Sequence, residues 1–391
     1  MNIRITPYNL KGTVTPPPSK SMAHRLLIAA ALAEGESKIE NLADSQDILA
    51  TKACLQALKT QKENELPHFD CGESGSTLRF MIPIALAVCG GGVFTGRGRL
   101  MERPQQPYFD LFAEKGIFYE QKDGALTVEG RLTAGIFSLA GNVSSQFITG
   151  LLYALPLLDG DSEIVLTTPL ESAPYVDMTL QALGDAGIEI ENENYRRFLV
   201  KGGQSYQPIR ARVEADWSQA AFWYAAKFLG AELEITGLRQ DSAQGDKAAA
   251  MHYEKLRQKG DMEIDLSECP DLLPPLAVMA ARREGTTRFI NAGRLRIKES
   301  DRLTSVCRLL NALGGRAEEG ETSLTVEGVP QLEGGRVDGA NDHRIVMAAA
   351  IAAIACQNPM EILGAEAVSK SYPDFFEVYT ALGGNFVQIE A

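Results

Sequence analysis

NDHRIVMAAAIAAIA, residues 341–355, starts with charged side chains and is then apolar around the whole circumference of a helix. A helix without a polar face is buried inside a protein. The same design, a polar start followed by an apolar helix, recurs at residues 19–33, 75–88, 144–158, 218–230 and 271–282. The sequence therefore predicts six buried helices, which other elements must surround.

A second set of helices is amphipathic, and five of them end at a glycine before a short strand. These are LFAEKGIFYE (111–120), LQALGDAGIEI (180–190), EKLRQKGDMEI (254–264), LLNALGGRAEE (309–319) and YTALGGNFVQI (379–389). Glycine supplies the left-handed turn that closes a helix. We expect that turn at Gly116, Gly187, Gly260, Gly315 and Gly384. A sixth amphipathic helix is predicted over residues 48–58, and a polar loop follows it in place of a glycine turn.

Short runs rich in β-branched residues lie between the helices and indicate strands. They are SEIVLTT (162–168), RRFLVKG (196–202), AELEITG (231–237), TTRFINA (286–292) and TSLTVEG (322–328). The expected class is α/β, with six similar units divided between two domains. A chain of 391 residues is also too long for one hydrophobic core.

The composition indicates a globular cytoplasmic protein. Apolar residues make up 45% of the chain, but the longest apolar run, residues 80–89, is too short to cross a bilayer and contains Pro83. The N-terminus lacks the apolar core of a secretion signal. The six cysteines are scattered. We expect buried free thiols in a reducing compartment.

Charge and motifs exclude several function classes. A formal net charge of −13 without a basic stripe argues against nucleic-acid binding. Four histidines and no zinc-type spacing argue against a metal site. The sequence also lacks a GxSxG elbow and a GxxxxGK[ST] loop.

Cations and hydroxyl groups instead gather where the buried helices of the N-terminal half begin. PPSKSMAHR (17–25) places Lys20, Ser21 and Arg25 behind the cap residue Ser19. A helix start offers unpaired N–H groups and partial positive charge, which suit phosphate. GESGSTLRF (72–80) repeats this arrangement, and GNVSSQF (141–147) repeats the hydroxyl groups without a cation.

The C-terminal half carries a matching set. RLRIKESDR (294–302) places Lys298 and Arg302 four residues apart, on one face of an expected helix, with Glu299 beside them. Asp342, His343 and Arg344 begin a buried helix, Lys370 lies near another helix start, and Asp271 heads a third. A carboxylate among cations can accept a proton.

Each of these motifs also has an ordinary structural reading, such as a solvated salt-bridge ladder for residues 298–302 or a helix cap for Asp271. Their recurrence in both halves favours a site for highly anionic small molecules. Anionic ligands would also offset the repulsion among the clustered cations.

Seven motifs, in order from residue 17 to residue 376, resemble the 5-enolpyruvylshikimate-3-phosphate (EPSP) synthase family: PPSKSMAHR, GESGSTLRF, ERPQQPY, SSQFITGLL, RIKESDR, NDHRIVMA and VSKSYPDFF. The resemblance implies the enolpyruvyl transferase fold: two inside-out, barrel-like α/β domains of three βαβαββ repeats each. It implies an N-terminal domain at 19–213 and a C-terminal domain at 1–18 plus 214–391, with crossovers near Pro17–Ser19 and Val213–Asp216.

The resemblance also implies a reaction without a cofactor or metal, the transfer of enolpyruvate from phosphoenolpyruvate to shikimate 3-phosphate. The acceptor would be held by Lys20, Ser21, Arg25, Ser144, Ser145, Gln146, Ser172, Tyr175, Asp271 and Lys298. Phosphoenolpyruvate would be held by Lys20, Gly75, Arg103, Gln146, Arg302, Arg344 and Lys370. Asp271 would take the hydroxyl proton and Glu299 would protonate the methylene carbon, with Lys20, His343 and Lys370 as possible helpers.

Four positions depart from the family pattern: Glu73, Met101, Ala173 and Arg294. Two alternatives stay open. The sister family that uses UDP-N-acetylglucosamine shares the fold, but it has a Lys-Asn pair where this chain has Lys20-Ser21. A catalytically inactive binding homologue is disfavoured by the intact Lys20, Asp271, Glu299 and Arg344. The expected partners are the two small substrates, with no nucleic acid, no membrane and a monomeric state.

Overall fold

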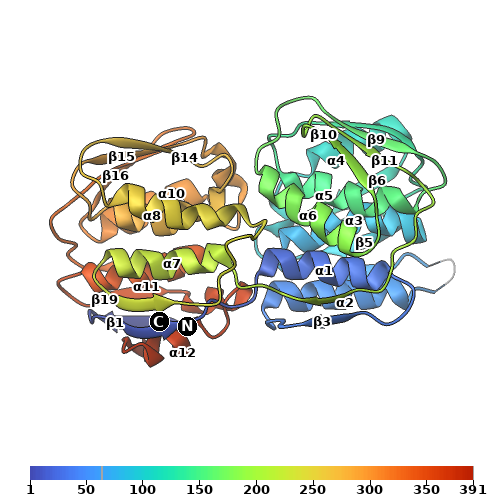
Figure 1. Ribbon diagram of the computed structural model, residues 1–391. Coiled ribbons are helices and arrows are strands. Elements are labelled where there is room, and N and C mark those ends of the chain that lie inside the picture. Colours follow the sequence, from blue (N-terminus) through green and yellow to red (C-terminus); the bar gives the residue numbers. More distant parts are fainter. Residues whose placement is uncertain (63–64, 391) are drawn as a thin grey trace. The chain divides into compact units, whose positions relative to one another are not determined.

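The protein, described here by a computed structural model over residues 1–62 and 65–390, forms two compact units (Figure 1). The split unit combines Met1–Pro17 with Glu214–Ala391, and the inserted unit is Pro18–Val213. Each unit contains three buried helices, amphipathic helices and several small sheets. Among the described residues, no helix combines the length and hydrophobicity needed to cross a bilayer.

The inserted unit is built around α1 (Lys20–Leu32), α3 (Gly75–Cys89) and α5 (Ser145–Ala154). Helices α3 and α5 pack against each other. The amphipathic helices are α2 (Gln46–Lys59), α4 (Gln106–Lys115) and α6 (Ala173–Asp185), and α1 packs on α2 and α6. The predicted buried and amphipathic helices of this half are thus confirmed.

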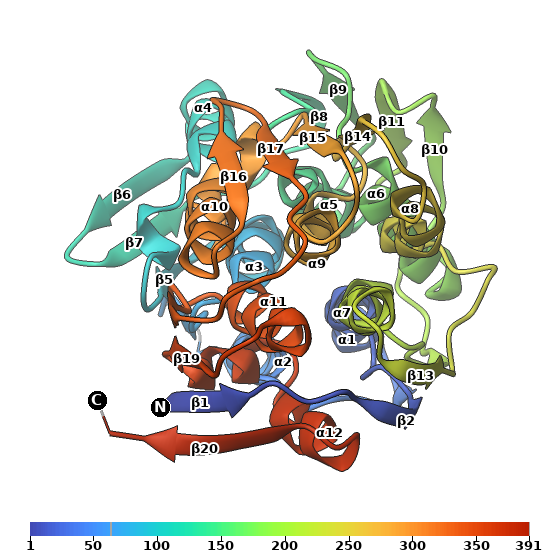
Figure 2. The ribbon, with the colours of Figure 1, turned by 90° about the vertical axis from the view of Figure 1, so that its left-hand side faces the viewer.

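The split unit repeats the plan with α7 (Trp217–Phe228), α9 (Leu273–Ala280) and α11 (His343–Ala352), which pack on one another. Every residue of α9 and α11 is buried, because neither helix has a polar face. Figure 2 shows these three helices nearly end-on, inside this unit's strands. The amphipathic helices are α8 (Ala248–Leu256), α10 (Arg302–Ala312) and α12 (Phe375–Ala381).

Among the described residues, four sheets, two in each unit, have four strands and the same pattern of pairing, in which one parallel pair is followed by two antiparallel pairs. In the inserted unit, β4 (His68–Asp70) runs parallel to β5 (Gly91–Thr95), and the hairpin of β6 (Phe118–Lys122) and β7 (Ala125–Glu129) adds antiparallel to β5. The helices α3 and α4 make the connections, which gives the predicted βαβαββ repeat. A second sheet joins β8 (Gly135–Leu139), β9 (Ser162–Leu166), β10 (Ile190–Glu193) and β11 (Arg197–Val200).

In the split unit, one such sheet joins β14 (Met262–Asp265), β15 (Thr286–Ile290), β16 (Arg316–Glu319) and β17 (Leu324–Glu327). The other joins β18 (Arg336–Asp338), β19 (Met360–Leu363), β20 (Asn385–Ile389) and the N-terminal strand β1 (Asn2–Thr6). Strand β1 lies between β19 and β20 and pairs antiparallel with both. The first strand of the chain therefore completes a sheet made by its end.

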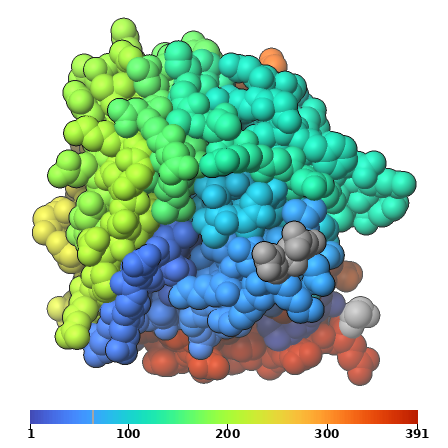
Figure 3. All heavy atoms as spheres, turned by 90° about the vertical axis from the view of Figure 1, so that its right-hand side faces the viewer, coloured from blue at the N-terminus to red at the C-terminus, as the bar shows by residue number. Residues whose placement is uncertain are grey.

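Two further sheets are parallel pairs of strands distant in sequence. In the inserted unit β3 (Lys38–Glu40) pairs with β12 (Arg210–Arg212), and in the split unit β2 (Lys11–Val14) pairs with β13 (Glu232–Ile235). Figure 3 shows the first pair at the surface, where chain near residue 40 (blue) lies beside chain near residue 210 (yellow-green). Each pair ties the beginning of its unit to a much later segment.

Side-chain caps fix where the buried helices begin. Ser19, Ser74 and Ser144 accept the N–H groups of Met22, Thr77 and Gln146, and Asp216 and Asp342 do the same for α7 and α11. Such a cap satisfies one of the unpaired N–H groups at a helix start. The predicted Ser19 cap is confirmed.

Three details of the sequence analysis are wrong. The left-handed glycines after α10 and α12 are Gly314 and Gly383, one residue before Gly315 and Gly384, because both helices end one residue earlier than their pattern suggests. Gly116, Gly187 and Gly260 have positive φ as predicted. Cys89 and Cys307 are only half-buried, although all six thiols are free. Lys298 and Arg302 do not share a helix, because the Asp301 cap starts α10 at Arg302.

Candidate active site

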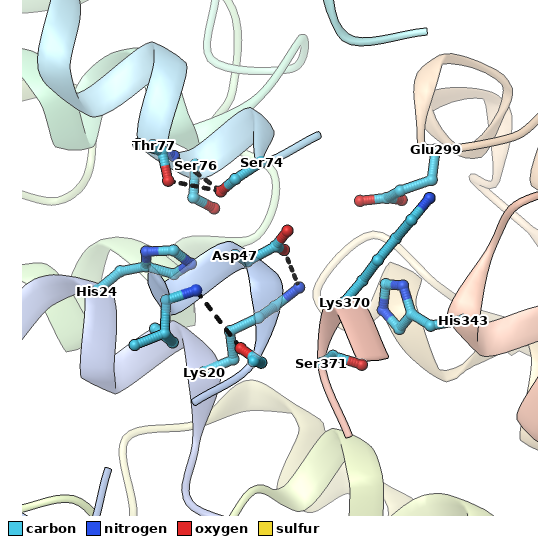
Figure 4. A network of polar contacts seen from close by, with 12 residues as sticks. Lys20, His24, Asp47, Ser74, Ser76, Thr77, Glu299, His343, Lys370 and Ser371 are labelled. Atoms are coloured by element: carbon cyan, nitrogen blue, oxygen red, sulfur yellow. Dashed lines mark hydrogen bonds and ion pairs between the residues drawn. The ribbon is translucent and has the colours of Figure 1, made fainter. Parts of the chain in front are cut away.

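The first turn of α1 presents Lys20 beside a buried carboxylate. The Lys20 ammonium lies 2.6 Å from Asp47 Oδ2, and the side chains are 16% and 9% exposed. Figure 4 marks this ion pair with a dashed line. Asp47 lies in the first turn of α2, where partial positive charge favours an acid. The contact therefore fixes the beginning of α1 against the beginning of α2.

Arg25 lies one turn further along α1 and is 2% exposed. Its guanidinium donates to the Ser21 carbonyl at 2.7 Å, the Tyr175 carbonyl at 2.8 Å and the Thr179 hydroxyl at 2.9 Å. Burial lowers the pKa of Arg25 to about 10, so it remains charged at neutral pH. Arg25 thus connects α1 to the start of α6.

The starts of α3 and α5 are connected by a polar network. Arg79 donates to Gln146 Oε1 at 2.7 Å, and Gln146 Nε2 donates to the Ser76 hydroxyl at 2.9 Å. The Arg79 guanidinium also lies over the Phe147 ring, 4.7 Å from its centroid. Gln146 therefore faces the first turn of α3.

Gly75, the first residue of α3, packs directly against Arg103. A Cβ atom at Gly75 would lie 2.5 Å from Arg103 Nη1 and 2.8 Å from its Cζ. Arg103 follows the short helix η1 (Leu100–Glu102) and is 6% exposed. Only glycine leaves room for the guanidinium in this position.

The remaining predicted residues of this unit lie at two helix starts. Ser144 caps α5 and Ser145 is its first residue. Ser172 precedes α6 with φ of 59° and is buried. The N–H of Tyr175 donates to the Ser172 carbonyl at 3.0 Å. The structure thus brings Ser172 and Tyr175 together with Arg25.

In the split unit, Arg302 binds three carboxylates. This side chain, 1% exposed, donates to Asp342 Oδ2 and to Asp271 Oδ1, each at 2.9 Å, and also to Glu299. Burial lowers the pKa of Arg302, but these acids outweigh that effect and raise its pKa above the usual range. The guanidinium is therefore a permanent cation that holds three acids around it.

Asp271 receives cations from two more sides. Arg344 Nη2 lies 2.9 Å from Asp271 Oδ2, and Lys298 Nζ lies 3.5 Å from Oδ1. Burial would raise the pKa of Asp271, but Arg344, Lys298 and Arg302 together hold it well below its usual value. Asp271 lies in the short helix η4 (Pro270–Leu272) before α9 and forms no cap. The alternative interpretation of Asp271 as a helix cap is therefore wrong.

Lys370 and His343 lie beside this cluster. Lys370 ends the short helix η7 (Ala365–Lys370), which packs on α11, and its ammonium donates to the Asn341 carbonyl at 2.6 Å. His343 is the first residue of α11 and is 1% exposed. Figure 4 includes both side chains together with Glu299. The predicted residues of this half thus lie at the starts of α9, α10 and α11 or next to them.

Three groups in these contacts have no role that could be predicted from the sequence motifs. They are Asp47, Asp342 and Ser218, whose hydroxyl accepts from Arg344 at 3.0 Å and donates to Asp216 at 2.6 Å. An acid in the first turn of a helix is common, so nothing in the sequence marks Asp47 as a partner of Lys20. Among the described residues, no group of His, Cys, Asp and Glu side chains is arranged to hold a metal ion.

Comparison with known proteins identifies the family. The EPSP synthase (3-phosphoshikimate 1-carboxyvinyltransferase) family model matches residues 5–379. This chain belongs to the EPSP synthase family. The 3-phosphoshikimate 1-carboxyvinyltransferases of Clostridium beijerinckii and Clostridium acetobutylicum are both 45% identical to it. The alignments cover 98% of this chain and 98% and 97% of those proteins.

Solved structures agree on the fold of this EPSP synthase family member. An EPSP synthase from Acinetobacter baumannii has a TM-score of 0.79 at 22% identity, covering 99% of this chain and 100% of that one. The enolpyruvyl transferase NikO from Streptomyces tendae has a TM-score of 0.80 at 19% identity, covering 100% and 99%. The predicted α/β enolpyruvyl transferase fold is thereby confirmed.

The four departures from the EPSP synthase pattern have defined places. Glu73 lines a cavity of about 330 Å³ with Asp70 and Arg97. Arg294 donates to the Ser267 carbonyl, Ala173 opens α6, and the carbonyl of Met101 accepts from Gln121. Glu73 is the nearest of the four to Gly75 in sequence, two residues before it.

Proposed function

We propose that this chain transfers the enolpyruvyl group of phosphoenolpyruvate to the 5-hydroxyl of shikimate 3-phosphate, releasing phosphate. The observation that carries the proposal is the ionised Asp271 held by Arg302, Arg344 and Lys298 at the start of buried helices. Such a carboxylate can accept a proton while its cations bind an anionic substrate. The names of the full-length relatives support the same reaction.

The reaction has two balanced steps. In the first, a proton adds to the methylene carbon of phosphoenolpyruvate while the 5-hydroxyl oxygen bonds to C2 and loses its own proton. In the second, the resulting methyl group loses a proton, the C2–O bond to phosphate breaks, and the double bond re-forms. The protein must position two polyanions and move protons, and positioning alone can lower a barrier by roughly 7–11 kcal/mol.

The proposed roles follow the two units. In residues 19–213, Arg25 and Ser21 would hold shikimate 3-phosphate with Ser144, Ser145, Gln146, Ser172 and Tyr175. Gly75 and Arg103 of this domain would bind phosphoenolpyruvate. Lys20 would contact both substrates, because an ammonium can serve two anions at once.

Residues 1–18 and 214–391 would supply the acid–base chemistry. Asp271 would take the proton of the 5-hydroxyl, and Glu299 would donate to the methylene carbon. Arg302, Arg344 and Lys370 would hold phosphoenolpyruvate, and Lys298 would contact the acceptor. Anionic substrates would share the cations that now lower the pKa of Asp271, which would strengthen it as a base.

Phosphate release tests this function. Purified protein should release phosphate only when phosphoenolpyruvate and shikimate 3-phosphate are both present, and not with UDP-N-acetylglucosamine as acceptor. If the chain is instead a catalytically inactive binding homologue, no phosphate will be released with either acceptor. Release with the nucleotide sugar alone would instead assign the chain to the sister activity.

We also infer a monomeric, cytoplasmic enzyme that needs no cofactor or metal. The six free thiols support a reducing compartment. A mass near 42.4 kDa by light scattering would support the monomer, and twice that mass would contradict it. Activity should persist after dialysis against a chelator.

A further inference from the structure

A buried chain of hydrogen bonds joins three helices of the inserted unit. His24 Nδ1 lies 2.7 Å from Thr51 Oγ1, Thr51 Oγ1 lies 2.7 Å from Thr77 Oγ1, and Thr77 Oγ1 donates to Ser74 Oγ at 2.7 Å. All four side chains are at most 1% exposed. The chain therefore connects α1, α2 and the start of α3. Figure 4 shows its two ends, His24 and the Thr77–Ser74 pair.

The proton order along this chain is set from its Ser74 end. Thr77 has one hydroxyl proton, which it donates to Ser74. Thr51 must then donate to Thr77, because a hydroxyl group carries one proton only. Thr51 has no proton left for His24, so the imidazole must donate from Nδ1. His24 thus carries a proton on Nδ1.

The surroundings of His24 agree with a neutral ring. Burial lowers the pKa of His24 well below its usual value, and the nearby positive charges of Lys20 and Arg25 lower it further. Its Nε2 atom is buried and has no hydrogen-bond partner among the residues that the structure describes. A protonated ring would leave a buried donor without a partner at Nε2.

The far end of the chain reaches the candidate site. Ser74 caps α3 by accepting the Thr77 N–H at 3.1 Å, and Gly75 follows as the first residue of the helix. With the Thr77 hydroxyl and N–H both bound, the two acceptor positions of Ser74 Oγ are filled. The chain thus fixes the helix start that packs against Arg103.

We propose that His24 is a positioning residue, which as the Nδ1–H donor orders Thr51, Thr77 and Ser74 and so holds Gly75 and Arg103 in place for phosphoenolpyruvate. This inference rests on the proposed function. This chain of hydrogen bonds does not include Arg25, which is anchored separately by Thr179 and Tyr175. Loss of the chain should therefore affect phosphoenolpyruvate more than shikimate 3-phosphate.

Steady-state kinetics of paired variants test the positioning role. His24→Phe keeps a ring but removes the donor, and Thr51→Val keeps the shape but removes the hydroxyl. Each should raise KM for phosphoenolpyruvate about tenfold, since small displacements of a binding group are costly. KM for shikimate 3-phosphate should change less than about threefold. His24→Asn and Thr51→Ser restore a donor and a hydroxyl, and they should return KM for phosphoenolpyruvate to within about threefold of the wild type.

A double variant and a control separate positioning from general loss of structure. The double variant His24→Phe with Thr51→Val should raise KM for phosphoenolpyruvate no more than either change alone, because both interrupt the same chain of hydrogen bonds. Thr287→Val removes a comparable buried hydroxyl, which accepts from Arg283 in the split unit, and should leave both KM values unchanged. Equal increases in both KM values, or no rescue by His24→Asn and Thr51→Ser, would overturn the proposal.

The tautomer of His24 is a readout that needs no substrate. Nitrogen-15 NMR of the whole protein should show His24 neutral at pH 7 with the proton on Nδ1, and His24→Asn identifies its signal. A proton on Nε2 would overturn the inference even if the enzyme is active. If wild-type protein releases no phosphate, the proposed function fails, and the NMR result still decides the proton order.

Discussion

Individual residues of the candidate site are defined by their charged partners. Lys20 and Asp47 form one buried pair, and Asp271 lies among three cations. Removing one member of a buried pair leaves the other charge uncompensated, at a cost of about 3–5 kcal/mol. Exposed pairs contribute little. Helix α2 contributes one member to each kind of pair, Asp47 to the buried one and Lys52 to the exposed one.

Asp47→Asn should therefore destabilise the protein by about 2–4 kcal/mol, because Lys20 loses its carboxylate in a nearly buried place. KM for both substrates should rise as Lys20 becomes less well positioned. Urea denaturation and kinetics check these effects. The matched control is Asp44→Asn, which breaks the exposed Lys52–Asp44 pair and should cost less than about 0.5 kcal/mol. Equal losses in the two variants would contradict the argument.

Asp271→Asn should lower kcat by about 10²–10⁴-fold, because it removes the proposed base. It should also change the pH dependence of stability. The pKa of Asp271 is lower in the folded than in the unfolded protein, so its stabilising contribution is complete above the unfolded value of about 4 and is lost as the pH falls below it. Denaturation from pH 7 to pH 3 should show the variant less stable at pH 7 and the difference shrinking below about pH 4. A difference that grows at low pH would contradict the assigned cations.

At the scale of elements, the buried helices were the most predictable part of the chain. Their lack of a polar face and their capping residues are local properties, so α1, α3 and α11 could be identified from the sequence. The pairing of β1 with β19 and β20 could not be derived from local patterns, because these strands lie more than three hundred residues apart. The start of α10 was misplaced because spacing alone gave no weight to the Asp301 cap.

The first turn of α3 depends on a glycine. Gly75→Ala should displace the Arg103 guanidinium, since its Cβ would come within 2.5 Å of Nη1. The guanidinium is the end of a flexible side chain, so the fold should survive, while KM for phosphoenolpyruvate should rise about tenfold or more. Kinetics and thermal denaturation measure the two effects.

Gly184→Ala is the matched control for this substitution. Gly184 lies in α6, and apart from its chain neighbours and the backbone of its own helix, nothing lies within 4 Å of an added Cβ. The change should raise stability by up to about 1 kcal/mol without affecting either KM. An unchanged KM for phosphoenolpyruvate in Gly75→Ala would refute the proposed role of this turn.

At the scale of the whole molecule, a net charge of −13 coexists with cations gathered at the starts of buried helices. The sequence predicted this placement for Lys20 and Arg344, which each lie at such a start, whereas Arg302 begins the amphipathic helix α10. It also marked Asp271 as a carboxylate among cations, but it could not predict that Asp47 and Asp342 pair with Lys20 and Arg302, because those contacts arise through tertiary packing. The barrel-like closure of each domain stays a prediction.

The product formed in heavy water tests the central claim most directly. Protein incubated with phosphoenolpyruvate and shikimate 3-phosphate in D₂O should yield shikimate 3-phosphate with an enolpyruvyl ether at O5, visible by proton NMR. Deuterium should enter its methylene group, because the proposed addition passes through a methyl group. If unchanged substrates are recovered, or the ether forms at another oxygen, this chain does not catalyse the proposed reaction.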